Sequence, residues 1–103
     1  LDTFCPMGPA ILIGDKQPKT FEIHTYVNDE LRQTGSTADL IFDIPTLVST
    51  LSRSITLEPG DVIATGTPAG VGMGFTPPRF LADDDKVSIT ISDIGTLENP
   101  VGR

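Results

Sequence analysis

The chain has 103 residues, with 14 Asp and Glu against 7 Lys and Arg, and a formal net charge of −7. That length predicts one domain or part of one. The acidic balance argues against a nucleic-acid-binding protein, which carries a basic footprint. Hydrophobic residues make up 38% of the chain, which is typical of a globular protein rather than a disordered one. Gly (10) and Pro (9) are frequent, which indicates many turns and favours strands over long helices.

The cysteine content bears on the cellular compartment. Cys5 is the one cysteine, so no internal disulfide can form, and a thiol of this kind fits a reducing compartment. We therefore predict a cytoplasmic location. Between Phe4 and Pro6, Cys5 is interpreted as a small buried hydrophobe rather than a nucleophile. The sequence contains no apolar run long enough for a membrane helix and no signal peptide. It begins without Met, so we expect a fragment or a processed product.

Several strands are expected in the first third of the chain. Residues 10–13 form a short apolar run, which predicts a strand buried on both faces. Residues 21–27 alternate between apolar and polar side chains, as in a strand with one apolar face. Asn28-Asp29 has the chemistry of a hairpin turn, and residues 31–34 are predicted to return as the partner strand.

One clear helix is expected near residues 44–56. Pro45 fits its first turn, where a missing N–H costs nothing. The apolar positions fall at helical spacing and form one stripe, namely Ile44, Leu47, Val48, Leu51 and Ile55. Pro59-Gly60-Asp61 then marks a turn, and residues 62–64 form an apolar run that predicts a second buried strand.

The chain is expected to end in strands. Residues 86–92 alternate again, and residues 96–99 are predicted to form a short last strand before Pro100. In total we expect five or six strands and one helix. The predicted fold is mainly β (α+β), and the family resemblance given below implies a mixed β-sandwich or roll. A sheet of this size must close or pack on something, because its edges are otherwise exposed.

The stretch most suggestive of function follows the predicted strand at 62–64. Residues 65–72 read Thr-Gly-Thr-Pro-Ala-Gly-Val-Gly. Glycines let the backbone approach a ligand closely, and threonines supply hydroxyl groups. A strand that ends in such a loop is a common support for a ligand site. The same pattern is equally typical of a tight turn between two strands.

The sequence gives little support for a metal site, a nucleophilic catalytic site, a phosphate-binding loop or a dinucleotide-binding site. Glu22 and His24 lie two apart on one strand and could share a metal ion, but a solvent-facing position explains them better, because no further ligand lies nearby. The chain has a single His and no nucleophile elbow. No Lys-Ser/Thr follows the glycines as in a phosphate-binding loop. Residues 70–74 lack dinucleotide-binding spacing.

Four blocks of the chain resemble the fumarylacetoacetate hydrolase superfamily. They are LDTFCPMGP at the start, VNDELRQTGSTADLIFDIP in the middle, GDVIATGTPAGVG, and PPRFLADDDKVSITISDIGTLENPVG at the end. The blocks occur in the family's order and cover nearly the whole chain. The resemblance implies that residues 1–103 are the C-terminal portion of a single catalytic domain about twice as long.

The resemblance also implies a site and a chemistry. Thr67 would contact the carboxylate or carbonyl end of a small carboxylate substrate, and Thr65 and Gly66 would line the same pocket. Thr3 would stand next to a catalytic Lys just upstream and support it indirectly; a plain strand hydroxyl is the other interpretation of Thr3. Family members use a divalent ion, Mg2+ or alternatively Mn2+ or Ca2+, and its ligands and the catalytic residues are expected in the preceding half of the domain.

Three functions remain open at this stage. The first is metal-dependent hydrolysis or lysis of a C–C bond in a 2-oxo or 1,3-dicarbonyl carboxylic acid, such as an acylpyruvate or a fumarylacetoacetate-like compound. The second is an isomerase or decarboxylase of the homoprotocatechuate or oxaloacetate type on the same scaffold. The third is a β module that binds a small anion without catalysis. The family resemblance also implies a homodimer that needs the preceding half of the domain.

Overall fold

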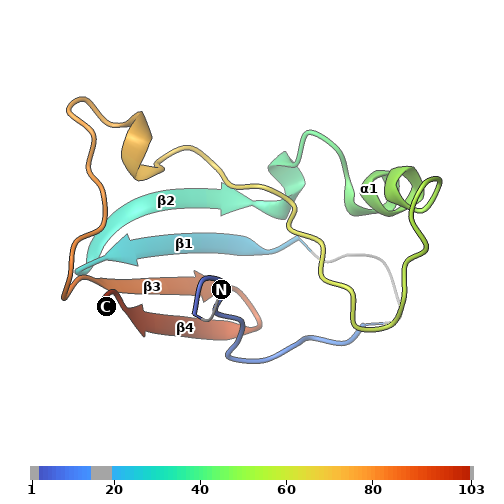
Figure 1. The fold of residues 1–103 in the computed structure, drawn as a ribbon, viewed down its shortest axis with the longest axis horizontal. Helices are drawn as coiled ribbons and strands as arrows, with labels where there is room; N and C mark the ends of the chain where they lie inside the picture. The colour runs from blue at the N-terminus through green and yellow to red at the C-terminus, as the bar shows by residue number, and fades with distance from the viewer. Residues whose placement is uncertain (1–2, 15–19, 103) are drawn as a thin grey trace.

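A computed structural model describes residues 3–14 and 20–102 of the chain. Its centre is a four-stranded antiparallel sheet in the order β2-β1-β3-β4 (Figure 1). The strands are β1 (Glu22–Val27), β2 (Glu30–Ser36), β3 (Lys86–Ile91) and β4 (Gly95–Pro100). One α-helix, α1 (Ile44–Leu51), and two short 3-10 helices, η1 (Thr37–Asp39) and η2 (Gly72–Gly74), lie outside the sheet. The predicted mainly β fold with one helix is therefore confirmed.

The β1–β2 hairpin matches the predicted alternation and turn. Asn28 and Asp29 both have positive φ angles, 50° and 64°, as a two-residue type I′ turn requires. Thr25 pairs with Gln33 and Tyr26 pairs with Leu31, so the intervening Arg32 has no partner in the ladder. This β-bulge bends β2 and changes the direction in which the side chains beside it point.

A network of polar contacts joins this hairpin to the start of β3. The Asn28 side chain donates to Asp85 Oδ1 at 2.6 Å and accepts from the backbone N–H of Lys86 at 2.9 Å. Asp85 Oδ2 accepts from the backbone N–H of Ala82 at 2.8 Å. The bond from Ala82, followed by the bond from Asn28, lowers the pKa of the Asp85 carboxyl. The network stabilises β3 beside β1 while that carboxyl is ionised.

This network predicts an acid-sensitive contribution to stability. A carboxyl whose pKa is lower in the folded state stabilises the fold above the ordinary Asp pKa of about 3.9, and the contribution is lost as pH falls through the lowered pKa. Asp85→Asn should lower the melting temperature at neutral pH and weaken its fall between about pH 4 and pH 2. Thermal melts of the protein at several pH values check this.

Asp84→Asn is the matched control, because it removes one charge but leaves both bonds of Asp85 in place. It should preserve the fall in melting temperature in acid. If Asp85→Asn and Asp84→Asn give the same pH dependence, the network around Asp85 does not stabilise the fold.

Helix α1 begins where the sequence predicts and ends earlier. Asp43 is its N-cap and accepts from the backbone N–H of Thr46 at 2.8 Å, and Pro45 occupies the first turn. The helix ends at Leu51 rather than near residue 56. Residues 52–54 read Ser-Arg-Ser, and the Ser52 hydroxyl donates to the Ser49 carbonyl at 3.1 Å. Serine hydroxyls compete with helical hydrogen bonds in this way, so the apolar stripe alone overestimates the helix.

Two predicted strands and one burial prediction are wrong. Residues 10–13 and 62–64 form no strand, and Ile11, Ile13 and Val62 are 88%, 91% and 69% exposed. Cys5 is also exposed. An apolar run indicates that a segment will be buried against other residues. A strand forms only if a second strand lies beside it to pair with. Within residues 3–14 and 20–102, no strand pairs with either run. Four strands are therefore described instead of five or six.

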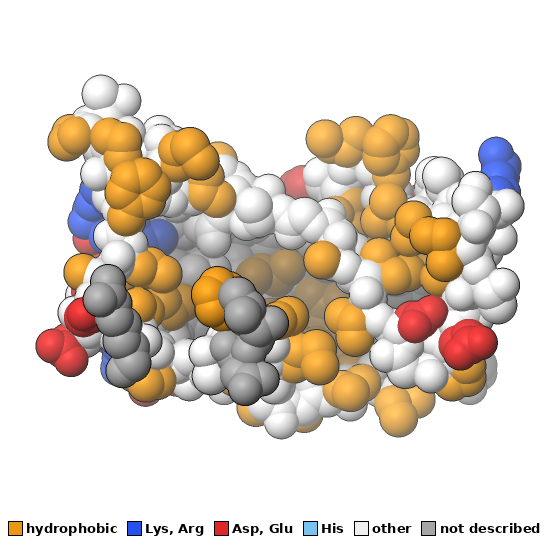
Figure 2. Space-filling view, viewed as in Figure 1, with side chains coloured by type: hydrophobic (Ala, Val, Ile, Leu, Met, Phe, Trp, Pro, Cys, Tyr) orange, Lys and Arg blue, Asp and Glu red, His pale blue; other side chains and the backbone are white. Residues whose placement is uncertain are grey.

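Very little of the described structure is buried. Val27, at 8% exposed, is the one hydrophobic residue in the interior of the described ranges. Figure 2 shows hydrophobic side chains gathered on one face around a central hollow. An exposed apolar surface of this kind is typical of a face that packs against another polypeptide. It agrees with the expectation that this chain is part of a larger domain. No helix in the described part of the chain has the length and apolar character needed to cross a bilayer.

Candidate functional site

Residues 65–72, here called the Gly/Thr loop, run back alongside β2 and form one wall of a cavity. Gly35 and Pro68 lie close enough that a Cβ on Gly35 would be 3.1 Å from the proline ring. Gly70 has a φ of +106°, and a Cβ on it would overlap the backbone carbonyl of Arg32 at the bulge. Glycine is required there both by conformation and by space. These contacts hold Thr65, Gly66 and Thr67 at the rim of the cavity.

The cavity has a volume of about 460 Å³, within the range typical of small-molecule sites. Its wall combines an apolar part, a row of hydroxyls and glycine backbone. Among the described residues that line it, Asp39 is charged and none is Lys or Arg. The lining residues are Ile23, Thr34, Gly35, Ser36, Thr37, Asp39, Leu40, Ile41, Phe42, Leu47, Thr65, Gly66, Thr67 and Pro68.

A side chain of β2, Gln33, forms a hydrogen bond with the hydroxyl of Thr67. Gln33 Nε2 donates to Thr67 Oγ1 at 2.8 Å and to the Pro68 carbonyl at 3.1 Å. Gly66 has a φ of +101° and open space where a Cβ would stand, so its backbone can be approached closely. The three residues predicted from the Gly/Thr loop thus share one cavity. Their contact with a substrate stays a prediction.

The remaining candidates lie elsewhere. Thr3 is exposed, has a φ of 66° and is not among the residues that line this cavity. Glu22 and His24 lie on the opposite side of β1 from Ile23, because side chains alternate along a strand. Among the described residues no group of three or more His, Cys, Asp or Glu could hold a metal ion. The donor set that a divalent ion needs is therefore not assembled by this part of the chain.

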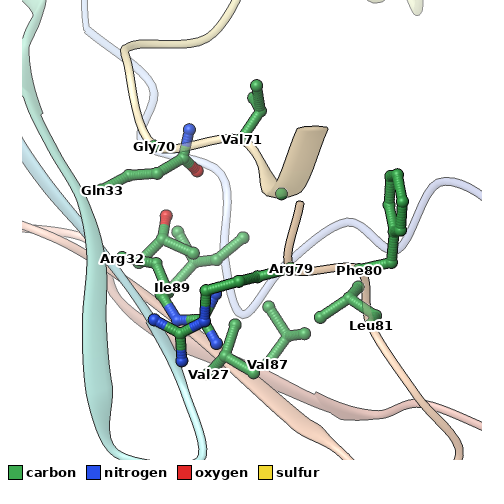
Figure 3. A pocket seen from close by; sticks show the side chains of 12 residues that line it. Val27, Arg32, Gln33, Gly70, Val71, Arg79, Phe80, Leu81, Val87 and Ile89 are labelled. Atoms are coloured by element: carbon green, nitrogen blue, oxygen red, sulfur yellow. The ribbon is translucent and has the colours of Figure 1, made fainter. Parts of the chain in front are cut away.

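A second cavity, of about 440 Å³, lies over the other end of the sheet. Arg32 and Arg79 line it, and Figure 3 shows their guanidinium groups side by side above Val27. Both guanidinium groups stack on the Phe75 ring, at 5.4 and 5.3 Å from its centroid. Arg79 donates to both carboxylate oxygens of Glu30, at 2.7 and 2.6 Å, and this lowers the pKa of Glu30. The cluster fastens the segment after η2 to β2.

Sequence reasoning missed Gln33 and the apolar wall of the first cavity. Gln33 lies 34 residues from Thr67, so no local spacing links the two. The bulge at Arg32 could not be inferred either, because its signal is the pairing of two strands. The exposed apolar pair Ile41 and Phe42 follows η1 and carries no periodicity. Only the Gly/Thr loop itself was visible in the sequence.

Comparison with known proteins identifies the family. The family description "Fumarylacetoacetate (FAA) hydrolase C-terminal" matches residues 1–102. Oxaloacetate tautomerase YisK of Bacillus subtilis is 57% identical over 99% of this chain and 35% of its own length. A fumarylacetoacetate hydrolase structure from Exiguobacterium antarcticum covers 99% of this chain and 37% of its own, at 50% identity and a TM-score of 0.93.

A maleylpyruvate hydrolase structure from Sphingobium sp. SYK-6, in complex with manganese and pyruvate, covers 98% of this chain and 36% of its own, at 44% identity and a TM-score of 0.85. This chain thus spans just over a third of the length of each of these proteins. The match along residues 1–102 confirms the resemblance that the four sequence blocks indicated. The chain therefore belongs to the fumarylacetoacetate hydrolase family of enzymes, which includes hydrolases and a tautomerase among these relatives.

Proposed function

We propose that this chain is the C-terminal portion of a single catalytic domain and supplies the carboxylate-binding wall of its active site. The reaction we propose is isomerisation, namely keto–enol tautomerisation of a small 2-oxo dicarboxylic acid such as oxaloacetate. One observation carries this proposal. Thr65, Gly66 and Thr67 line one cavity in a chain that is 57% identical to an oxaloacetate tautomerase.

The sequence blocks alone placed C–C bond hydrolysis first, and this similarity favours the alternative. Tautomerisation moves one proton between a carbon beside the carbonyl and the carbonyl oxygen, and no C–C bond breaks. Hydrolysis remains a second candidate, because a fumarylacetoacetate hydrolase and a maleylpyruvate hydrolase match nearly all of this chain at 50% and 44% identity.

Thr67 binds and orients the substrate in this proposal. Its hydroxyl donates to an oxygen of the substrate carboxylate, a charge-assisted hydrogen bond in a partly dry cavity. The open space beside Gly66 lets the backbone approach the same group. The described lining contains Asp39 and neither Lys nor Arg, so we place the positive charge that balances the substrate outside these described lining residues.

A divalent ion is consistent with that requirement. The maleylpyruvate hydrolase relative was solved with manganese and pyruvate, and we propose a metal-dependent enzyme here as well. The described residues do not fit the ion, so we place its ligands, as well as the residue that moves the proton, in the preceding half of the domain. We propose a homodimer on the family resemblance alone.

The proposal is tested with the complete protein that carries this chain, purified with Mg2+ or Mn2+. We expect it to accelerate loss of the enol absorbance of freshly dissolved oxaloacetate, without release of pyruvate or CO2. Release of CO2 would instead identify a decarboxylase, and turnover of an acylpyruvate with cleavage would identify a hydrolase. No turnover of any of these compounds, together with calorimetric binding of oxalate, would leave the small-anion-binding module as the function.

A further inference from the structure

Gln33 makes two hydrogen bonds to the loop that carries the proposed substrate-binding threonine. Its Nε2 donates to Thr67 Oγ1 at 2.8 Å and to the backbone carbonyl of Pro68 at 3.1 Å. Gln33 belongs to β2, and the loop follows 34 residues later. The contact is therefore made only when the loop lies against the sheet.

The bulge in β2 accounts for this placement. Arg32 has no partner opposite it, and Gln33 pairs with Thr25 directly after it. Figure 3 shows the Gln33 side chain leaving β2 toward the segment that carries Gly70. On that segment, the close approach of Gly70 to the carbonyl of Arg32 leaves little freedom in the distance between strand and loop. Gln33 also lines the second cavity, so it stands between the two.

The two bonds fix the direction of the amide. The Pro68 carbonyl can only accept a hydrogen bond, so the atom of Gln33 that faces it must be the nitrogen. The same nitrogen faces Thr67 Oγ1, and an amide nitrogen can only donate. Thr67 Oγ1 is therefore the acceptor in this pair.

A hydroxyl has one proton to donate. Because Thr67 Oγ1 accepts from Gln33, its own proton is free to be donated elsewhere, and Thr67 lines the first cavity. We propose that Gln33 is a positioning residue that sets the Thr67 hydroxyl as a donor into this cavity. The site thereby favours ligands that present an acceptor oxygen, such as a carboxylate, over ligands that offer Thr67 only a donor. This inference rests on the proposed role of Thr67 in binding the substrate.

Two variants of the complete enzyme separate the effect of the hydrogen-bond donors of Gln33 from the effect of its side-chain shape. Gln33→Met keeps the length of the side chain and removes both donors. It should lower kcat/KM for oxaloacetate roughly three- to tenfold, the weight of one neutral hydrogen bond, mainly through KM. Gln33→Glu keeps the shape, but its ionised carboxylate accepts the Thr67 proton. It should lower kcat/KM more than Gln33→Met at pH 7 and recover part of the loss as pH falls toward the ordinary Glu pKa of about 4.3.

A double-mutant cycle with Thr67→Val then tests whether Gln33 acts through Thr67. In the Thr67→Val background, Gln33→Met should change kcat/KM by less than about twofold. Multiplication of the two effects, or a fall in melting temperature without a change in KM, would overturn the inference and leave Gln33 as a structural link. If Thr67→Val alone has no effect on activity, the proposed role of Thr67 in binding the substrate is wrong, whatever Gln33 does. A loss with Thr67→Val but none with Gln33→Met overturns the positioning role alone.

Discussion

Thr67→Val should lower kcat/KM of the complete enzyme by about ten- to 150-fold while its melting temperature stays nearly unchanged. Valine keeps the shape of threonine and removes the hydroxyl. If that hydroxyl donates to an anionic substrate oxygen, its loss costs about 1.5–3 kcal/mol, the range for hydrogen bonds to charged groups, and this energy gives the stated change in rate. Thr67 is exposed, and in this variant Gln33 can still donate to the Pro68 carbonyl, so loss of the Gln33–Thr67 bond should destabilise the fold little.

Two controls sharpen this result. Thr67→Ser keeps the hydroxyl and should retain most of the activity. Thr96→Val removes a hydroxyl that lies 2.9 Å from that of Thr90 in the β3–β4 pair, outside both cavities, and should leave kcat/KM unchanged. Steady-state kinetics with oxaloacetate and thermal melts on the same samples measure both quantities. Full activity of Thr67→Val would remove Thr67 from the site. A lower melting temperature with a proportionate loss of activity would identify it as a structural residue.

Gly70→Ala should destabilise the protein strongly and lower its activity at the same time. Alanine is strained at a φ of +106°, which costs about 1–3 kcal/mol, and its Cβ would overlap the Arg32 carbonyl. The Arg32 carbonyl belongs to the main chain and the alanine Cβ is bonded directly to Cα, so no side-chain rotation relieves the overlap. The loop must move away from β2, and this movement separates Gln33 from Thr67.

Gly60→Ala is the matched control for this change. Gly60 has a φ of +103° and open space where the Cβ would stand, so it shares the backbone strain without the overlap. The difference between the melting temperatures of the two variants isolates the contact between Gly70 and Arg32. Equal destabilisation by both would show that the loop does not lie against the bulge.

The parts of the fold that the sequence predicts well are those set by local chemistry. The alternation in residues 21–27 and 86–92 indicates which residues share a face, and Asn28-Asp29 tolerates the positive φ angles of its turn. The start of helix α1 is predicted correctly because a proline suited to the first turn and an apolar stripe coincide. Its end is missed because the Ser52 hydroxyl donates to the backbone carbonyl of Ser49, a contact that the apolar stripe does not reveal.

The runs at 10–13 and 62–64 show where such reasoning fails. An apolar sequence indicates that a segment will be buried, but it does not identify the strand that will pair with it. Strand formation depends on that neighbouring strand. The candidate site likewise combines features that are visible in the local sequence with features that depend on long-range contacts. The Gly/Thr loop could be identified by its composition, while Gln33 could not, since its role depends on a pairing across the sheet. The shape of the cavity likewise depends on how η1 and α1 approach the loop, which no local pattern encodes.

The bulge in β2 also bears on how this strand can tolerate a change in length. In a regular strand, loss of one residue turns every later side chain to the opposite face. Near Arg32 the strand already holds one residue more than its partner requires. Deletion of Arg32 would leave Leu31 opposite Tyr26 and Gln33 opposite Thr25, with each side chain on its present face. This strand can therefore absorb a single-residue deletion at that point and keep its register, whereas a second one nearby would turn Gln33 away from the loop.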